Sequence, residues 1–271
     1  MRLEFGSKVL VMGILNVTPD SFSDGGRFFS NSDIAAQIDT MVETGADIID
    51  VGGESTRPFA EPVSIEDELA RVLPAIRLIR QRCPIPISID TTKAEVARKA
   101  LDEGVNIIND ISALRFDPNM ITLVRESEVP VIIMHMQGTP SDMQVDPHYG
   151  DVVVEIKDFF RERIAWAAEN GIPGNRFIID PGIGFGKTVE HNLSILKRVP
   201  EFSELGCPVL IGHSRKAFIG KLLNTGVDER DVATAAISAL CAMKGVSILR
   251  VHDVEKTVEA VRLAEAINGA D

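Results

Sequence analysis

The chain has 271 residues, of which 45% are hydrophobic and 25% are charged, so it has the composition of a globular protein with a large core. Its formal net charge of -12 argues against nucleic acid and anionic membrane surfaces as partners, because both are negatively charged. No apolar run approaches the roughly 20 residues that a membrane-spanning helix needs. The three cysteines lie far apart, and we expect reduced thiols in a cytoplasmic protein.

Eight short apolar segments alternate with amphipathic segments along the chain. An apolar run that ends at a polar residue or glycine is typical of a strand buried on both faces of a parallel sheet. The predicted strands are residues 9–15, 47–51, 85–89, 105–108, 129–134, 177–179, 208–211 and 247–249. Each unit has about 34 residues, the size of a strand with its crossover helix.

The segments between these strands have the 3.6-residue period of helices. Ile34, Ile38 and Met41 share one face of the first helix, and Gly45 closes it. Residues 91–95 predict a helix start with a threonine cap. Eight β-α units of similar size favour a single (β/α)8 TIM barrel, forming one domain over residues 1–271. A doubly wound open sheet is the alternative.

Two connections are longer than a barrel needs. Residues 17–33 follow the first predicted strand, and residues 54–66 follow the second. Both contain glycine and serine, and loops of this length in a compact barrel are often lids or binding loops. We therefore expect long mobile loops after strands 1 and 2.

Polar residues stand at or just beyond the predicted strand ends, which open on one face of a parallel barrel. Any single one is usually a satisfied turn residue, but burying several unpaired polar groups costs free energy. We therefore predict that they form one site. The residues are Asn16, Asp90, Asn109, Asp180, Lys216, Arg250 and His252.

The predicted site combines two chemistries. Two carboxylates, an amide and an ammonium match the edge of a planar, nitrogen-rich heterocycle, whose faces apolar side chains would sandwich. The polar residues are Asp90, Asn109, Asp180 and Lys216, and the apolar ones are Ile111, Met134 and Phe185. A second, basic group suits a phosphate or pyrophosphate. It consists of Asn16, Arg57, Ser214, Arg250 and His252.

Eight motifs in order resemble the dihydropteroate synthase family. They include Gly-Gly-Glu-Ser-Thr-Arg-Pro at residues 52–58 and Asp-Pro-Gly-Ile-Gly-Phe-Gly-Lys at residues 180–187. The others lie at residues 12–26, 88–91, 109–110, 134–140, 214–216 and 250–252. The resemblance covers nearly the whole chain and implies a barrel enzyme of folate biosynthesis. Such an enzyme condenses (7,8-dihydropterin-6-yl)methyl diphosphate with 4-aminobenzoate, releasing pyrophosphate and forming 7,8-dihydropteroate.

The resemblance also implies roles for individual residues. The catalytic residues would be Asp90, Lys216 and Arg57. The pterin would be bound by Asp90, Asn109, Ile111, Met134, Asp180, Gly212 and Lys216. The diphosphate would be bound by Asn16, Thr56, Arg57, Arg250 and His252. The 4-aminobenzoate pocket, where sulfonamides would compete, would be formed by Thr56, Pro58, Phe185, Ser214 and Lys216. Mg²⁺ bound by Asn16 and a homodimer are also implied.

This chemistry agrees with the residue types. An arylamine is already nucleophilic, so the reaction needs no activated side-chain nucleophile, and the sequence has no Ser-His-Asp or Cys-His pattern. Carboxylates would stabilise a pterin cation left by pyrophosphate. Two alternatives share the pterin site: a barrel that transfers methyl groups from a methylated folate to a corrinoid protein, and a non-catalytic pterin-binding paralogue.

Overall fold

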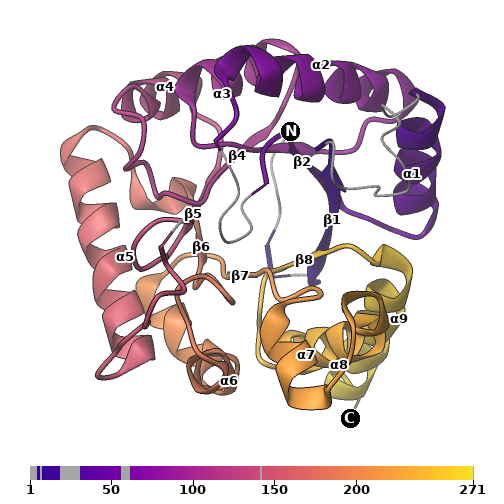
Figure 1. Cartoon of the computed structure of the whole chain (residues 1–271), viewed down its shortest axis with the longest axis vertical. Helices are drawn as coiled ribbons and strands as arrows, with labels where there is room; N and C mark the ends of the chain where they lie inside the picture. Colours follow the sequence, from indigo (N-terminus) through magenta and orange to yellow (C-terminus); the bar gives the residue numbers. More distant parts are fainter. Residues whose placement is uncertain (1–4, 7, 19–30, 56–61, 141, 271) are drawn as a thin grey trace.

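A computed structural model describes residues 5–6, 8–18, 31–55, 62–140 and 142–270, and shows parallel strands surrounded by helices (Figure 1). The strands are β1 (Leu10–Asn16), β2 (Ile48–Gly52), β3 (Ile87–Asp90), β4 (Ile107–Asp110), β5 (Val131–Met134), β6 (Phe177–Asp180), β7 (Leu210–Ile211) and β8 (Ile248–Val251). The α-helices are α1 (Asn31–Glu43), α2 (Ile65–Arg82), α3 (Ala94–Asp102), α4 (Met120–Ser127), α5 (Val152–Glu169), α6 (Val189–Lys197), α7 (Ala217–Leu223), α8 (Asp231–Met243) and α9 (Val254–Asn268). Short 3-10 turns are η2 (Gly174–Arg176), η3 (Val199–Leu205) and η4 (Val227–Glu229).

The strands form one sheet in the order β6-β5-β4-β3-β2-β1-β8-β7. A parallel bridge between Ile179 and Val209 joins β6 to β7, so the two edges of the sheet meet. Helices surround the strands (Figure 1). The predicted (β/α)8 barrel is therefore confirmed, and the alternative of an open sheet is wrong.

All eight predicted strands are present, although several begin later than predicted. The ladders of β3, β5 and β7 begin after Pro86, Pro130 and Pro208, because proline has no amide hydrogen to donate. The carbonyl oxygens of these prolines still accept hydrogen bonds from the neighbouring strands β2, β4 and β6. Proline thus marks where each ladder begins without ending the contact between strands.

An apolar layer fills the barrel interior below the carboxyl ends of the strands. It consists of Leu10, Met12, Ile48, Ile107, Ile132, Ile178, Leu210 and Ile248. Side chains alternate along a strand, so residues two positions further face the same interior but lie nearer the carboxyl ends. Those residues are Asp50, Asn109, Met134, Asp180, Gly212 and Arg250. The strand alternation therefore places a polar layer directly above an apolar one.

Two predictions about helix ends have different outcomes. Gly45 follows α1 with a φ of 98°, and its amide donates to Val42, as the glycine prediction requires. The predicted threonine cap of α3 is wrong. The amide of Ala94, the first residue of α3, donates to Asp117 Oδ2 at 2.8 Å, so a carboxylate from the loop before α4 takes the place of a local cap.

The long predicted loops fall largely on residues 19–30 and 56–61, which lie outside the described residues. Their predicted mobility stays a prediction. Within the described part of the chain, none of the helices combines the length and the apolar surface that crossing a bilayer needs.

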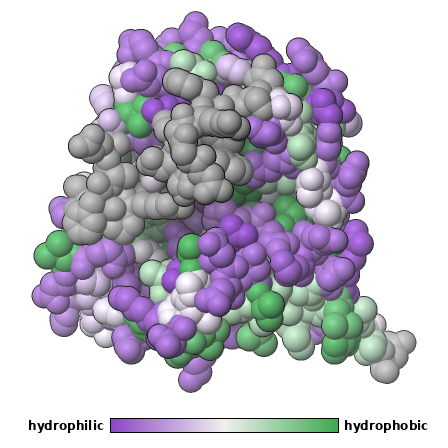
Figure 2. All heavy atoms as spheres, turned by 45° about the vertical axis from the view of Figure 1, so that its right-hand side comes forward, coloured by the Kyte–Doolittle hydropathy of each residue, from purple (hydrophilic) through white to green (hydrophobic). Residues whose placement is uncertain are grey.

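Exposed apolar side chains gather on the paired helices α8 and α9. They are Val232, Leu240 and Met243 on α8, and Leu263 and Ile267 on α9. Hydrophobic residues also gather in the lower part of the surface in Figure 2, whereas hydrophilic residues predominate elsewhere among the coloured residues of that face. We call Val232, Leu240, Met243, Leu263 and Ile267 together the α8–α9 stripe.

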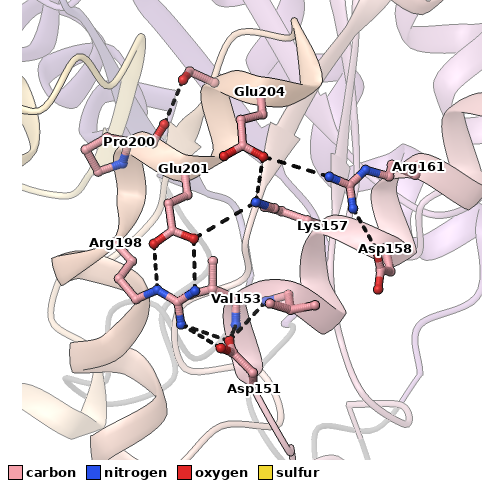
Figure 3. Close-up of polar contacts among 11 residues, drawn as sticks. Asp151, Val153, Lys157, Asp158, Arg161, Arg198, Pro200, Glu201 and Glu204 are labelled. Atoms are coloured by element: carbon pink, nitrogen blue, oxygen red, sulfur yellow. Dashed lines mark hydrogen bonds and ion pairs between the residues drawn. The ribbon is translucent and has the colours of Figure 1, made fainter.

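A polar network joins α5 to the segment after α6 (Figure 3). Asp151 caps α5 by accepting from the amides of Val153 at 3.0 Å and Val154 at 3.1 Å. Arg198 donates to the same carboxylate at 2.8 Å and to Glu201 at 2.7 Å. Lys157, which is largely buried, pairs with Glu204 at 2.8 Å. The network fixes the long helix α5 against η3.

We expect Asp151→Ala to lower the free energy of unfolding by about 1 kcal/mol, because two amides at the start of α5 lose their acceptor. Asp151→Asn keeps an acceptor oxygen and should lose much less. Asp158→Ala is the control, since it removes an exposed pair with Arg161 but no helix cap. Urea denaturation measures all three, and equal losses in the first two variants would contradict the cap interpretation.

Candidate active site

The predicted strand-end residues converge at the carboxyl end of the barrel. A β-carbon placed on Gly212 would lie 3.6 Å from Asp180 Oδ2 and 4.0 Å from Arg250 Cβ. Residues from β6, β7 and β8 therefore meet at one point, although Asp180 and Arg250 are 70 positions apart in the sequence. Because Gly212 has no side chain, the space between the side chains of Asp180 and Arg250 stays open.

Arg250 is the centre of the charged group. Its Nε donates to Asp50 Oδ2 at 2.6 Å and its Nη2 donates to Asp90 Oδ2 at 2.7 Å. Burial alone would lower the pKa of Arg250, but the attraction of these carboxylates raises it, so the guanidinium stays charged. Asn109 Nδ2 also donates to Asp50 at 3.2 Å. The strands β2, β3, β4 and β8 thus contribute to one connected polar layer.

Two acids in this layer, Asp90 and Asp180, have raised pKa values. Burial raises the pKa of Asp90 to about 7, and the nearby charges of Asp50 and Glu68 add to the rise, whereas Arg250 opposes it. Burial also raises the pKa of Asp180, against the effect of the Gly182 amide, which donates to Asp180 Oδ1 at 2.8 Å. Perturbed acids in a polar layer are typical of functional sites.

Lys216 approaches the site from the loop between β7 and α7. Its Nζ lies 4.0 Å from the ring centre of Phe185, close enough for a cation–π contact. Burial lowers the pKa of Lys216 to about 8, and Arg250 adds to this, while Asp180 and Asp90 oppose it. A β-carbon on Gly184 would lie 3.0 Å from Lys216 Cδ, so the loop after β6 lies against this side chain.

The predicted ring-stacking residues form a separate apolar cluster. Ile111, Met134 and Phe185 cluster with Met136 and Met143 beside the polar layer. A flat ring with polar edges could therefore contact apolar faces and charged groups together.

The Ser214–His252 pair forms the other side of the site. Ser214 Oγ lies 3.0 Å from His252 Nδ1 and accepts from the His252 amide at 3.1 Å. Burial lowers the pKa of His252 to about 3, and Arg250 and Arg215 add to the effect. The sequence analysis grouped this histidine with the basic residues, but in the structure its burial and the nearby guanidinium groups disfavour the charged imidazolium.

Asn16 ends β1 next to Gly52 and Asp90. A β-carbon on Gly52 would lie 3.5 Å from Asn16 Oδ1 and 3.8 Å from Asp90 Oδ2, so two oxygen atoms border a space that only glycine leaves open. Within the described residues, no group of three or more His, Cys, Asp or Glu side chains could hold a metal ion. One or two oxygens with substrate phosphates is nevertheless the usual Mg²⁺ arrangement, so Asn16 fits this ion.

The structure brings together most of the predicted site, and it adds residues that the sequence analysis missed. The other predicted members, Thr56, Arg57 and Pro58, lie outside the described residues. Asp50 is fully buried and contacts both Arg250 and Asn109. A signal for it was present, because an acid between Ile49 and Val51 is unusual inside a buried strand.

The fold and this layered site define a class of protein. The chain belongs to the pterin-binding enzyme family, whose model matches residues 12–252.

Within that class, its relatives are dihydropteroate synthases. The enzyme of Escherichia coli (strain K12) is 50% identical over 94% of this chain and 90% of its own length. The structure of Yersinia pestis dihydropteroate synthase in complex with a sulfonamide drug is 40% identical, covers both chains completely and has a TM-score of 0.94. The Xanthomonas albilineans dihydropteroate synthase with 4-aminobenzoic acid is 44% identical, covers 98% of this chain and 95% of its own, and has a TM-score of 0.91.

We expect Asp50→Ala to lower the free energy of unfolding by about 3 kcal/mol, because Arg250 loses a buried partner. Asp50→Asn retains an oxygen for Asn109 and should lose less. Chemical denaturation at pH 7 measures both variants. A loss below about 1 kcal/mol in Asp50→Ala would mean that Asp90 alone is enough to balance Arg250.

Proposed function

We propose that this chain is a dihydropteroate synthase. It condenses (7,8-dihydropterin-6-yl)methyl diphosphate with 4-aminobenzoate in folate biosynthesis and releases pyrophosphate. The observation that carries this proposal is the polar layer of Asp90, Asn109 and Asp180 beside Lys216 and Arg250, bordered by an apolar cluster. The relatives of the chain support the same reaction, since they are named dihydropteroate synthases.

The polar layer recognises the edge of the pterin. Asp180 and Asn109 accept from its amino and ring N–H groups or donate to its carbonyl, and Lys216 donates to a ring acceptor. Met134 and Ile111 cover the ring faces. Gly212 leaves room for the ring between Asp180 and Arg250. Burial of the acids makes each hydrogen bond stronger than it would be in water.

The reaction begins when the bond between the methylene carbon and the diphosphate oxygen breaks, and the electron pair leaves with pyrophosphate. The positive charge left on the pterin is spread over its ring, and the carboxylate of Asp90 stabilises it as it develops. The arylamine lone pair then forms the carbon–nitrogen bond, and the nitrogen releases one proton. Phe185 and Lys216 hold 4-aminobenzoate for this attack, together with Ser214, Thr56 and Pro58.

Arg250, His252, Arg57 and Thr56 bind the diphosphate end. Arg250 lies between the acids and the Ser214–His252 pair, so an incoming diphosphate competes with Asp50 and Asp90 for its guanidinium. His252 contributes an imidazole whose lowered pKa makes it a weaker cation than Arg250. Asn16 would hold Mg²⁺ through its amide oxygen, and the ion would supply positive charge beside the leaving pyrophosphate.

The wild-type protein tests the proposal directly. Pyrophosphate release should require both substrates, and 7,8-dihydropteroate should appear in equal amount. Calorimetry should show tighter binding of the pterin diphosphate when Mg²⁺ is present. Release that does not depend on 4-aminobenzoate would overturn the synthase assignment, and binding without any turnover would favour a non-catalytic pterin-binding protein.

We expect kcat/KM to follow a bell-shaped pH profile with its maximum between about 7 and 8. Asp90 must be ionised to stabilise the cation, and its raised pKa of about 7 makes activity fall below that pH. Lys216 must be charged to donate, and its lowered pKa of about 8 makes activity fall above that pH. Asp90→Asn should remove the acidic limb together with most activity. A flat profile from pH 6 to 9 would contradict these assignments.

We also propose a homodimer that places the α8–α9 stripe at the interface. The stripe is exposed to an unusual degree for apolar side chains, with Val232 at 74% and Leu263 at 63%. It lies on the outside of the barrel, away from the strand ends, so pairing of two chains leaves the site open. The free cysteines Cys83, Cys207 and Cys241 support a cytoplasmic location, where thiols stay reduced.

Sedimentation should show a dimer for the wild-type chain and a monomer for the double variant Leu240→Glu, Leu263→Glu, because buried carboxylates without partners oppose association. Circular dichroism should remain that of the folded barrel. Val145→Glu is the matched control, since Val145 is 71% exposed but lies outside α8 and α9. A wild-type monomer at micromolar concentration would contradict the proposal.

A further inference from the structure

Lys187 is a buried lysine that none of the roles above uses. It lies between β6 and α6 and is only 4% exposed. Its Nζ donates to the carbonyl oxygen of Phe185 at 2.8 Å and to that of His135 at 3.3 Å, and it lies 3.1 Å from His135 Nδ1. One ammonium thus joins the end of β5 to the loop that follows β6.

The partners of this ammonium are all neutral. In the part of the chain that the structure describes, Lys187 has carbonyl and imidazole acceptors but no carboxylate within ion-pair distance. Burial lowers the pKa of His135 well below its usual value, and the charge of Lys187 adds to this, so the imidazole is neutral and Nδ1 can accept. Burial lowers the pKa of Lys187 to about 7, against the attraction of the Asp180 carboxylate, because the charged form is costly to bury, so stability alone is a poor reason for this lysine.

The two segments that Lys187 joins carry opposite parts of the apolar cluster. Met134 comes directly before His135, and Phe185 comes two residues before Lys187. Both belong to the cluster that borders the polar layer, and the Phe185 ring also contacts the Lys216 ammonium. Any shift of the Phe185 backbone would therefore move the ring on which Lys216 rests.

The backbone around Lys187 leaves little freedom for such a shift while the hydrogen bonds from Lys187 to Phe185 and His135 are intact. A β-carbon on Gly182 would lie 2.0 Å from the His135 carbonyl oxygen, and one on Gly186 would lie 2.9 Å from that of Gln137. Tyr149 Oη donates to the Gly186 carbonyl at 2.9 Å. The loop after β6 is thus pressed onto the chain after β5, and Lys187 supplies side-chain hydrogen bonds between them.

We propose that Lys187 is a positioning residue for the second substrate, because its ammonium ties Phe185 to the end of β5 and so fixes the ring that orients Lys216 and the arylamine. This inference rests on the proposed synthase activity. Lys187 does not touch the reacting atoms. It acts through Phe185, so its loss should affect the pocket for 4-aminobenzoate more than the pterin-binding acids.

Lys187→Met removes the three hydrogen bonds while keeping a side chain of similar length. We expect the KM for 4-aminobenzoate to rise about 10-fold, because a small displacement of Phe185 misplaces the amine, while the KM for the pterin diphosphate changes less than about twofold. Lys187→Gln retains a donor at this position and should give an intermediate KM. It also keeps the inference testable if Lys187→Met does not fold.

Lys157→Met is the matched control. Lys157 is also a buried lysine, at 7% exposure, but it pairs with Glu204 in the network of Figure 3, away from the strand ends. It should leave both KM values within about twofold of the wild-type values whatever it does to stability. A general loss of stability would therefore be separated from a change in the pocket.

Amide hydrogen exchange tests, without any substrate, whether Lys187 holds the loop after β6 against the end of β5. Exchange at residues 182–186 should be faster in Lys187→Met than in the wild type, and unchanged in Lys157→Met, because the Phe185 amide donates to Gly182 within that loop. Faster exchange with a raised KM supports the inference. A folded Lys187→Met variant with the wild-type KM overturns it, whatever its exchange. Failure of the wild type to make dihydropteroate would instead overturn the proposed function. Hydrogen exchange would still show whether Lys187 restrains the loop of residues 182–186.

Discussion

The charge of Arg250 makes the polar layer of the barrel possible. Asp50 and Asp90 lie on the neighbouring strands β2 and β3, and Arg250 donates to both of these buried carboxylates. The guanidinium has the planar geometry to bind one carboxylate through Nε and another through Nη2. Its position on β8, next to β1 in the sheet, lets it reach across the opening toward β2 and β3. The acids can therefore stay in place above an apolar layer.

That arrangement follows from the alternation of side chains along parallel strands. Ile48 is followed two residues later by Asp50, Ile107 by Asn109, and Ile178 by Asp180. The first residue of each pair fills the barrel, and the second faces its open end. A register shift of one residue would exchange these faces, so the ladders that fix the fold also fix the chemistry. The lower layer excludes water from below, which strengthens the charges above it.

Much of this was accessible from the sequence. The eight apolar runs and the polar residues behind them predicted the barrel and the convergence of Asn16, Asp90, Asn109, Asp180 and Arg250, because parallel strands all end on one face. What the sequence did not reveal depends on distances between separate segments. The Asp50–Arg250 pair joins residues 200 positions apart, and a cap from Asp117 replaces the predicted threonine cap of α3. The lowered pKa of His252 depends on burial and on nearby guanidinium groups, neither of which local patterns encode.

The weakest seam of the barrel lies between β6 and β7, where β7 has two residues and one bridge makes the closure. The loops that follow β6 and β7 carry Phe185 and Lys216, and the contact between these side chains adds to the sparse backbone pairing. Because so little backbone pairing joins β6 to β7, a cut in the chain at this boundary disturbs the sheet little. Joining the original ends and cutting between η3 and β7 would give a circular permutant that keeps every extended ladder intact. Of two fragments divided there, the first would carry Asp90, Asn109 and Asp180 and the second would carry Lys216 and Arg250, so catalysis would report their reassembly.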